Sequence, residues 1–385
     1  MKKINQELIA LFDKYGSDRR RALRENKKLS YLYALADLRE NLLDWCQFDP
    51  EQQALQIGAD AGALTGLLAR RLSSVTVLDV SEENLEVVRR RFKTEPELAA
   101  KIRYVCADVE TYAREAEKRG GTYGYVVLIG NLTAADRAGR AAQMTAAKQL
   151  LSAHGTLIAA ASNWFGVKYM AGAERETGAL SWNEMKQLLP GGEFYYPMPD
   201  YRTPVSIYSD QYLPKKGDLT RVTPAYDYPP YHMMDMGEKF DEVCEAGVFD
   251  LYANSYLVFW QANASMQASD RRIYIKYNKT RREQFQIKTC ICERLTEQSA
   301  PAPYENLQEV QVSAGAGTEG AENKQSTSTS SASVQNAGTP GHANKVWKRY
   351  VEKSALSLDG AEHIWSFEKK YRALTNQHRT LKVAK

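Results

Sequence analysis

The sequence lacks any long hydrophobic segment. No run of about eighteen apolar residues occurs in its 385 residues, so no helix that spans a membrane is expected. The first residues, Met1-Lys2-Lys3-Ile4, are not followed by the apolar region that marks a secretory signal peptide. The protein is therefore predicted to be cytoplasmic.

Cysteine and histidine are scarce. The five cysteines include no Cys-x-x-Cys pair, which argues against zinc and disulfide frameworks, and no metal site is predicted. Of the five histidines, only His154 and His232 lie outside the C-terminal region. Histidine is the side chain most often used as a general base. His232 is the better of these two candidates, because His154 is expected in a turn.

The main body of the chain has no excess of positive charge. The net charge is +4, but residues 345–385 hold ten Lys or Arg against four Asp or Glu, which leaves −2 for residues 1–344. A protein that binds DNA or RNA by charge carries a basic face, so the body is not expected to bind DNA. The basic tail is a candidate contact for a protein partner, although a solvated helix explains its charge equally well.

A strand, a small-residue turn and a helix are indicated where Leu55-Gln56-Ile57 runs into Gly58-Ala59-Asp60-Ala61-Gly62. Such turns bring backbone close to a ligand at a helix N-terminus. Asp79 follows Gly58 by about 20 residues, where nucleotide-binding units carry an acid for a ribose. A dinucleotide turn has glycines at its first, third and sixth positions. Here glycines occupy the first and fifth, which resembles the first motif of class I S-adenosylmethionine-dependent methyltransferases.

Strand and helix patterns alternate along the next hundred residues, which predicts a parallel, doubly wound sheet. Three helices are expected between the strands, at 82–92, 109–118 and 135–151. The fold class is therefore α/β, a Rossmann-like seven-stranded methyltransferase sheet with N-terminal helices, a long insertion before the last strand and a small C-terminal appendage. The seven strands are expected at 55–57, 75–79, 102–106, 125–130, 156–161, 193–196 and 255–260.

Composition divides the chain into five parts. Residues 266–296 alternate apolar and polar residues like a half-solvated β-hairpin, and 297–344 are rich in Ser, Thr, Gly and Ala like a disordered linker. The predicted parts are an N-terminal helical segment at 1–45, a methyltransferase domain at 46–265 with an insertion at about 197–254, the hairpin, the linker, and a basic strand and helix tail at 345–385.

The resemblance to class I methyltransferases implies a cofactor, S-adenosylmethionine, and a set of residues around it. Asp79 would hold the ribose hydroxyls, Asp108 would lie beside the adenine amine, and Asn131 would lie at the acceptor side, unless it only caps a helix. The implied cofactor-binding residues are Gln56, Gly58, Ala59, Asp60, Gly62, Asp79, Asp108, Ile129 and Asn131.

Three positions depart from the pattern of that class. The first strand usually ends in Glu, but Gln56 stands here. Asp60 replaces a small residue of the turn, and its carboxylate would crowd and repel a ligand that carries a carboxylate. The fourth strand usually begins with an acid, but Gly124 stands here. Together the three changes leave open the alternative that cofactor binding is weak or lost.

A narrower resemblance rests on Leu38–Trp45, Asn163–Tyr169 and a Pro-Asp-Tyr and Tyr-Ser-Asp region at 196–214. These segments resemble methyltransferase-like proteins of bacterial surface-polysaccharide (capsule or lipopolysaccharide type) biosynthesis. The resemblance implies a glycan, nucleotide-sugar or lipid-linked acceptor. Candidate residues for catalysis or sugar binding are His232, Asp200, Tyr201, Tyr208 and Asp210; alternatively the insertion only packs on itself.

The C-terminal part resembles the beginning of a lipopolysaccharide-kinase-like small lobe. Lys348 stands where a strand lysine would lie, and Glu368 falls on the expected next helix. No catalytic loop or metal-binding acid follows, so a kinase remnant or a docking element is the most that the resemblance implies, and a plain core-packing helix is the alternative.

Two alternatives to a glycan methyltransferase remain open. A methyltransferase-like scaffold that has lost its cofactor and recruits partner enzymes is favoured by Gln56, Asp60 and Gly124. An RNA methyltransferase is suggested because Gly62–Thr65 resembles ribosomal adenine dimethyltransferases. Those enzymes carry Asn-Leu-Pro-Tyr after the fourth strand, whereas this chain has Asn131-Leu132-Thr133-Ala134.

Overall fold

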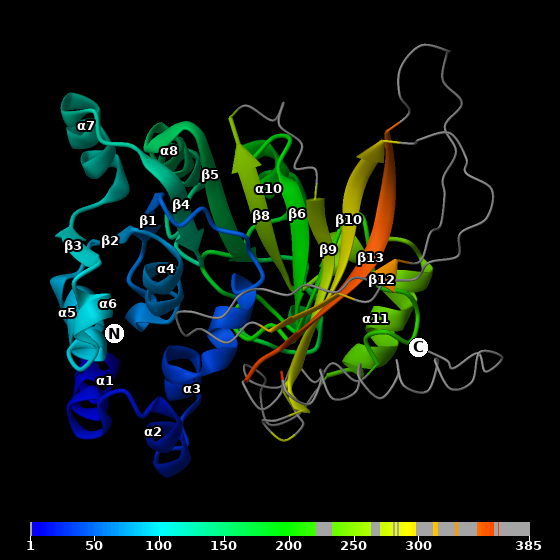
Figure 1. Ribbon diagram of the computed structural model, residues 1–385, viewed down its shortest axis with the longest axis horizontal. Helices are drawn as coiled ribbons and strands as arrows, with labels where there is room; N and C mark the ends of the chain where they lie inside the picture. Colours follow the sequence, from blue (N-terminus) through cyan, green and yellow to red (C-terminus); the bar gives the residue numbers. More distant parts are fainter. Residues whose placement is uncertain are drawn as a thin grey trace. The chain divides into compact units, whose positions relative to one another are not determined.

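A computed structural model of the protein describes residues 2–220, 233–262, 270–279, 282, 285–297, 311–314, 328–329, 345–357 and 361 (Figure 1). The chain divides into two compact units, Met1–Met266 and Gln267–Lys385. Within the described residues, no helix is long and apolar enough to cross a membrane.

A mixed sheet forms the centre of the first unit, in the order β7-β6-β8-β5-β4-β1-β2-β3. The strands β1 to β5 pair in parallel, whereas β8 pairs antiparallel with both β5 and β6. This arrangement confirms the α/β fold class. The strands are β1 Gln53–Ile57, β2 Ser74–Asp79, β3 Ile102–Cys106, β4 Tyr123–Ile129, β5 Leu151–Ser162, β6 Glu193–Met198, β7 Ser206–Ser209 and β8 Ser255–Gln261.

Two details of this sheet differ from the sequence-based expectation. The insertion contributes an additional strand, β7, which pairs antiparallel with β6. The strand β5 begins at Leu151 rather than at residue 156, so His154 lies within the strand and not in a turn. The pairing with β4 shifts register between Tyr123 and Tyr125, and the additional residues of β5 are accommodated there.

Helices fill the connections between the strands. Several begin at a side chain that caps the first turn: Ser81 accepts the N–H of Asn84 before α5, and Asp136 accepts that of Gly139 before α8. The helices are α1 Lys2–Tyr15, α2 Arg19–Glu25, α3 Leu29–Leu35, α4 Thr65–Arg71, α5 Glu82–Phe92, α6 Pro96–Ala99, α7 Val109–Arg119, α8 Arg137–Gln149, α9 Val167–Met170, α10 Trp182–Leu188, α11 Met236–Glu245 and α12 Phe249–Tyr252, with 3₁₀ turns η1 Asp37–Leu42 and η2 Asp60–Gly62.

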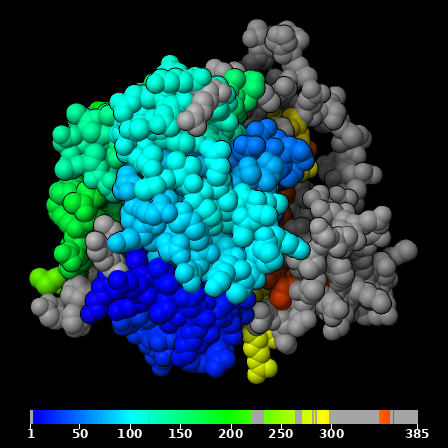
Figure 2. Space-filling model, turned by 90° about the vertical axis from the view of Figure 1, so that its left-hand side faces the viewer, coloured from blue at the N-terminus to red at the C-terminus, as the bar shows by residue number. Residues whose placement is uncertain are grey.

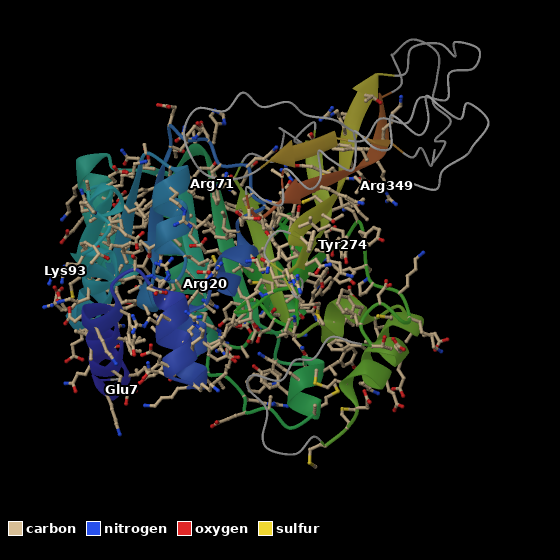
Figure 3. The ribbon with its side chains drawn as sticks, turned by 60° about the horizontal axis from the view of Figure 1, so that its bottom comes forward. Glu7, Arg20, Arg71, Lys93, Tyr274 and Arg349 are labelled. Atoms are coloured by element: carbon tan, nitrogen blue, oxygen red, sulfur yellow. The ribbon has the colours of Figure 1, made fainter. Side chains whose placement is uncertain are left out.

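The N-terminal helices pack on α5 through a small hydrophobic core. Leu8 and Phe12 of α1, Leu35 of α3 and Val87 of α5 are buried together there. Glu7 on α1, labelled in Figure 3, accepts hydrogen bonds. The donors are Lys28 at 3.0 Å and Tyr31 at 2.9 Å, which ties α1 to α3. In the space-filling view these helices, in dark blue, form a continuous surface with the lighter blue and cyan segments that follow β1 and β2 (Figure 2).

A mostly antiparallel sheet forms the described part of the second unit. The strands β9 Asp270–Asn278 and β10 Ile287–Glu297 make a hairpin, and β13 Lys345–Ala355 pairs with β10. Two short strands, β11 Gln311–Ala314 and β12 Ser328–Thr329, pair with β13, the first of them in parallel, and were not expected, because they fall within the predicted linker.

Charged pairs cross this second sheet. Glu293 on β10 accepts hydrogen bonds from Arg271 and Arg349, and these bonds hold its pKa below the usual value although burial raises it. Lys348, which the kinase resemblance singled out, is exposed on β13. The rest of the predicted linker 297–344, the predicted tail helix and Glu368 lie outside the described residues.

Candidate active site

A cavity of about 340 Å³ lies at the carboxyl ends of β1, β2 and β4. Ligands of open α/β sheets bind at this edge, where the strand order reverses. The turn after β1 and the residues that follow β4 form one side, and α1, α3 and η1 contribute side chains to the other. The leading helices therefore cover the predicted cofactor side of the sheet.

Gln56 holds the turn after β1 from beneath. Its side chain is buried and donates from Nε2 to the carbonyl of Gly58 at 2.9 Å, while its Oε1 accepts from the hydroxyl of Thr65 at 2.8 Å. A glutamate in this rotamer would set a carboxylate oxygen against that carbonyl. Gln56 is thus a positioning residue for the turn, and it does not itself line the cavity.

The turn contains two consecutive non-glycine residues in the left-handed region. Asp60 has a φ of 42° and Ala61 a φ of 49°, conformations that cost energy in residues with a side chain. Arg91 of α5 stabilises them, because its Nη1 donates to the carbonyl of Ala61 at 3.0 Å and to that of Ala34 at 2.6 Å. The same guanidinium therefore joins the turn to the N-terminal helices.

Arg39 pairs with Asp60 at the cavity. Its Nη2 forms an ion pair with Oδ2 of Asp60, and the Arg39 side chain is only 3% exposed, whereas that of Asp60 is 36% exposed. Both residues line the cavity. The negative charge that the turn introduces is therefore balanced by a buried positive charge from η1.

Asp79 at the end of β2 connects the turn to the next helix. Its Oδ2 accepts from the backbone N–H of Ala59 at 2.8 Å. Its Oδ1 accepts from the N–H of Ser81 at 2.8 Å and from the side chain of Asn84 at 3.0 Å. The carboxylate lines the cavity, which is where a ribose-binding acid is expected.

Two glycines allow side chains to lie close against the cavity floor. Asn131 lies over Gly58, where a Cβ would collide with its amide, and donates to the carbonyl of Ile57 at 3.3 Å. A Cβ on Gly130 would come within 2.6 Å of the hydroxyl of Tyr201. Asn131 is held by backbone after β4 and caps no helix, because Asp136 begins α8.

Packing also explains why a glycine stands at position 124. A Cβ at this position would collide with the side chain of Gln52, which occupies the space beside β4. The acid expected here would not fit with Gln52 in place. Gly124 lies at the amino end of β4, away from the cavity.

Asp108 caps α7 rather than lining the cavity. Its carboxylate is exposed and accepts the backbone N–H of Thr111 at 2.7 Å. That hydrogen bond lowers the pKa of Asp108. Among the described residues, neither Asp108 nor Gly62 lines the cavity. Gly62 instead packs against Arg91, whose Cδ would lie 2.8 Å from a Cβ added at Gly62.

The candidate acceptor residues separate into two groups. Asp200 follows β6 at the cavity edge of the sheet, and its carboxylate lies 3.6 Å from the buried amine of Lys168. The Lys168 amine also contacts the hydroxyl of Ser162 and Oε1 of Glu176, each at 3.0 Å. Arg202 pairs with the other oxygen of Glu176 at 2.7 Å. Asp200 therefore belongs to a buried charge network and is not placed to act as a base.

Tyr208 and Asp210 lie towards the opposite end of the strands. Because β7 runs antiparallel to β6, Tyr208 pairs with Tyr196, and the backbone N–H of Asp210 contacts the carbonyl of Phe194. Asp210 accepts a hydrogen bond from the hydroxyl of Tyr196. Neither residue lines the cavity, and His232 lies outside the described residues.

Part of the chain matches a known domain family. Residues 54–155 match the family model of a methyltransferase domain. The fold is that of a class I methyltransferase. The match covers both the turn after β1 and Asp79, and it supports the predicted cofactor, S-adenosylmethionine. No curated protein matches the sequence.

Solved structures of methyltransferases are among the distant matches. The N-methyltransferase NodS from Bradyrhizobium japonicum, in complex with S-adenosyl-L-homocysteine, is 18% identical with a TM-score of 0.30, over 40% of this chain and 72% of that chain. Magnesium protoporphyrin IX methyltransferase from Synechocystis, with bound S-adenosylmethionine, is 14% identical with a TM-score of 0.33, over 49% and 86%. An O-methyltransferase family protein from Burkholderia thailandensis is 11% identical with a TM-score of 0.34, over 61% and 59%.

Three residues that line this cavity were not predicted from the sequence. Arg39 and Tyr33 come from the leading segment, and Arg202 follows β6. Tyr201, which also lines the cavity, was predicted from the Pro-Asp-Tyr motif, but as a sugar contact. Arg39 falls within the Leu38–Trp45 segment that carried the family resemblance, and that was the one signal for it.

Replacing Gln56 by glutamate is expected to destabilise the domain. The carboxylate would face the carbonyl of Gly58 without a proton to share, and the free energy of unfolding should fall by about 1–3 kcal/mol. Gln53→Glu, on the exposed first position of β1, is the matched control. Urea unfolding of both variants measures the difference, and an equal effect of the two would contradict the positioning role.

Proposed function

We propose that the protein transfers a methyl group from S-adenosylmethionine to a glycan or glycan precursor of surface-polysaccharide biosynthesis. The observation that carries the methyl-transfer part is the cavity beside Asp79 in a domain that matches a methyltransferase family. The glycan part rests on the resemblance of the segments at 38–45, 163–169 and 196–214.

The residues at the cavity fit the cofactor. Asp79 supplies a carboxylate for ribose hydroxyls and keeps the turn in place through the N–H of Ala59. Gly58 and Gly130 keep the floor free of Cβ atoms. The bound cofactor supplies a methyl group already activated as a sulfonium, so the protein's contribution is to align the acceptor.

Tyr201 and Arg202 are the proposed acceptor contacts on the side of β6. The guanidinium of Arg202 lies 5.2 Å from the ring centroid of Tyr33 and 5.5 Å from that of Tyr201. Burial raises the pKa of Tyr201 to about 12, so its hydroxyl stays protonated near neutral pH and can donate a hydrogen bond. Aromatic faces and such donors are suited to sugar hydroxyls and ring faces.

The scaffold alternative loses most of its support. It depended on Gln56, Asp60 and Gly124, and a neighbouring group explains each of these residues. Gln56 bonds Thr65 and the turn carbonyls, and Asp60 pairs with Arg39. Gly124 leaves room for the side chain of Gln52. The second unit keeps its proposed role as a kinase-like remnant or docking element for a protein partner, with exposed Lys348 on β13 as one contact.

Transfer of a radiolabelled methyl group from S-adenosylmethionine tests the proposed function. Separate reactions would offer nucleotide-sugars, lipid-linked oligosaccharides, isolated capsular glycans, transfer RNA and a protein mixture. Label in a glycan fraction is the expected result. Label confined to RNA or protein would overturn the glycan assignment and leave methyl transfer in place.

A further inference from the structure

The guanidinium of Arg39 is charged, buried and only partly paired. Its Nη2 contacts Asp60, but within the described residues its Nε and Nη1 have no hydrogen-bond partner. A buried charged donor without a partner is destabilising. Because Arg39 lines the cavity, a ligand bound there could satisfy these donors.

Arg39 and Asp60 present opposite charges side by side at one end of the cavity. Arg39 has two unused charged donors, Nε and Nη1, which point to different sides of the guanidinium, and either can donate to an oxygen of a carboxylate. Asp60 is more exposed than Arg39, so its carboxylate can accept from a cation. The pair is therefore complementary to a group that carries a carboxylate and an ammonium on one carbon.

We propose that Arg39 and Asp60 bind the amino-acid end of the cofactor, with Arg39 on its α-carboxylate and Asp60 on its α-ammonium. This inference rests on the proposed function, because the α-amino acid end belongs to S-adenosylmethionine. It reverses the expectation that Asp60 repels the ligand: Asp60 faces the ammonium, and Arg39 neutralises its effect on the carboxylate.

The turn after β1 places the proposed ribose contact, Asp79, next to the proposed contact for the amino-acid end, Asp60. Ala59 donates its backbone N–H to Asp79, and Asp60 is the next residue. The ribose acid and the amino-acid receptor are thus fixed to the same few residues of backbone. The η1 segment supplies Arg39 from the other side, so the N-terminal segment is part of the binding site and not only a cover.

Calorimetric titration of Arg39→Gln with paired ligands tests this assignment. S-adenosylhomocysteine carries the amino-acid end, and 5′-methylthioadenosine lacks it. The variant should bind S-adenosylhomocysteine about 30-fold more weakly than the wild type, because the charged hydrogen bonds from Arg39 to the α-carboxylate are lost. Its affinity for 5′-methylthioadenosine should stay unchanged, which also shows that the variant is folded. Arg71→Gln, with the same loss of charge on α4, is the matched control and should match the wild type.

A second variant separates the two ends of the pair. Asp60→Asn should weaken the binding of S-adenosylhomocysteine more than the binding of its analogue without the α-amino group, because only S-adenosylhomocysteine carries the ammonium. Equal losses of both adenosine ligands in Arg39→Gln would mean a structural role and overturn the assignment. So would wild-type protein that binds the two ligands equally well. Wild-type protein that binds neither ligand would contradict the proposed function itself.

Discussion

Replacing Asp79 by alanine is expected to reduce the affinity for S-adenosylhomocysteine at least 100-fold. The substitution removes the proposed acceptor for the ribose hydroxyls, and it also removes the bond that holds the N–H of Ala59 in the turn. Charged hydrogen bonds are worth about 1.5–3 kcal/mol each, so loss of two of them exceeds the factor of 100. This is the largest binding effect that the structure predicts.

Isothermal titration of Asp79→Ala beside Asp49→Ala measures it. Asp49 is an exposed carboxylate just before β1, at the end of the sheet opposite to the cavity, so its removal changes the charge equally without touching the site. Asp49→Ala should bind like the wild type. If Asp79→Ala kept wild-type affinity while remaining folded, the ribose site would lie elsewhere.

Replacing Lys168 by methionine is expected to destabilise the domain by about 3–5 kcal/mol, because it leaves the buried carboxylate of Asp200 without its cation. The amine contacts Glu176 at 3.0 Å and Asp200 at 3.6 Å, and its side chain is 3% exposed. Such a loss is a large part of the stability of a typical domain. Urea unfolding of the whole chain, monitored by tryptophan fluorescence, provides the measurement.

The pH dependence of this contribution follows from the Lys168 pKa. Burial lowers that pKa, but the charges of Asp200 and Glu176 outweigh burial and raise it above 10.5. A raised pKa means that the stabilisation is fully present below the unfolded value and is lost only as pH rises through the folded value. The wild type and Lys168→Met should therefore differ by a constant amount between about pH 6 and 9.

A surface lysine provides the comparison. Lys216 pairs with Glu245 at 3.0 Å, but both side chains are more than half exposed. Lys216→Met should leave the stability close to that of the wild type, because an exposed ion pair contributes little. A similarly small effect of Lys168→Met would show that Glu176 and Asp200 do not need the buried cation.

Local patterns predicted most of the sheet. Alternating strands and helices located β1 to β4 and α5, and the antiparallel pairing of β6 with β8 was also expected. The strand β7 was missed because four buried residues within a Tyr- and Pro-rich insertion give no clear period. Its antiparallel direction is what places Asp210 away from the cavity.

The partners of the site residues could not be predicted in the same way. The acidic side chain of Asp60 was visible in the sequence, but Arg39 lies in another element and meets it only through the fold. The same holds for Gln52, which fills the place of the acid expected at Gly124. A single sequence identifies an unusual residue, but only three-dimensional packing shows what compensates for it.

This site is expected to bind the cofactor although Gln56, Asp60 and Gly124 depart from the pattern of class I methyltransferases. Titration of the purified wild-type protein with S-adenosylhomocysteine tests it most directly. We expect a micromolar dissociation constant, which corresponds to a binding free energy of about −8 kcal/mol. No detectable heat or spectroscopic change at millimolar ligand would contradict it, and the Arg39–Asp60 pair would then be a closed ion pair in a site that has lost its ligand.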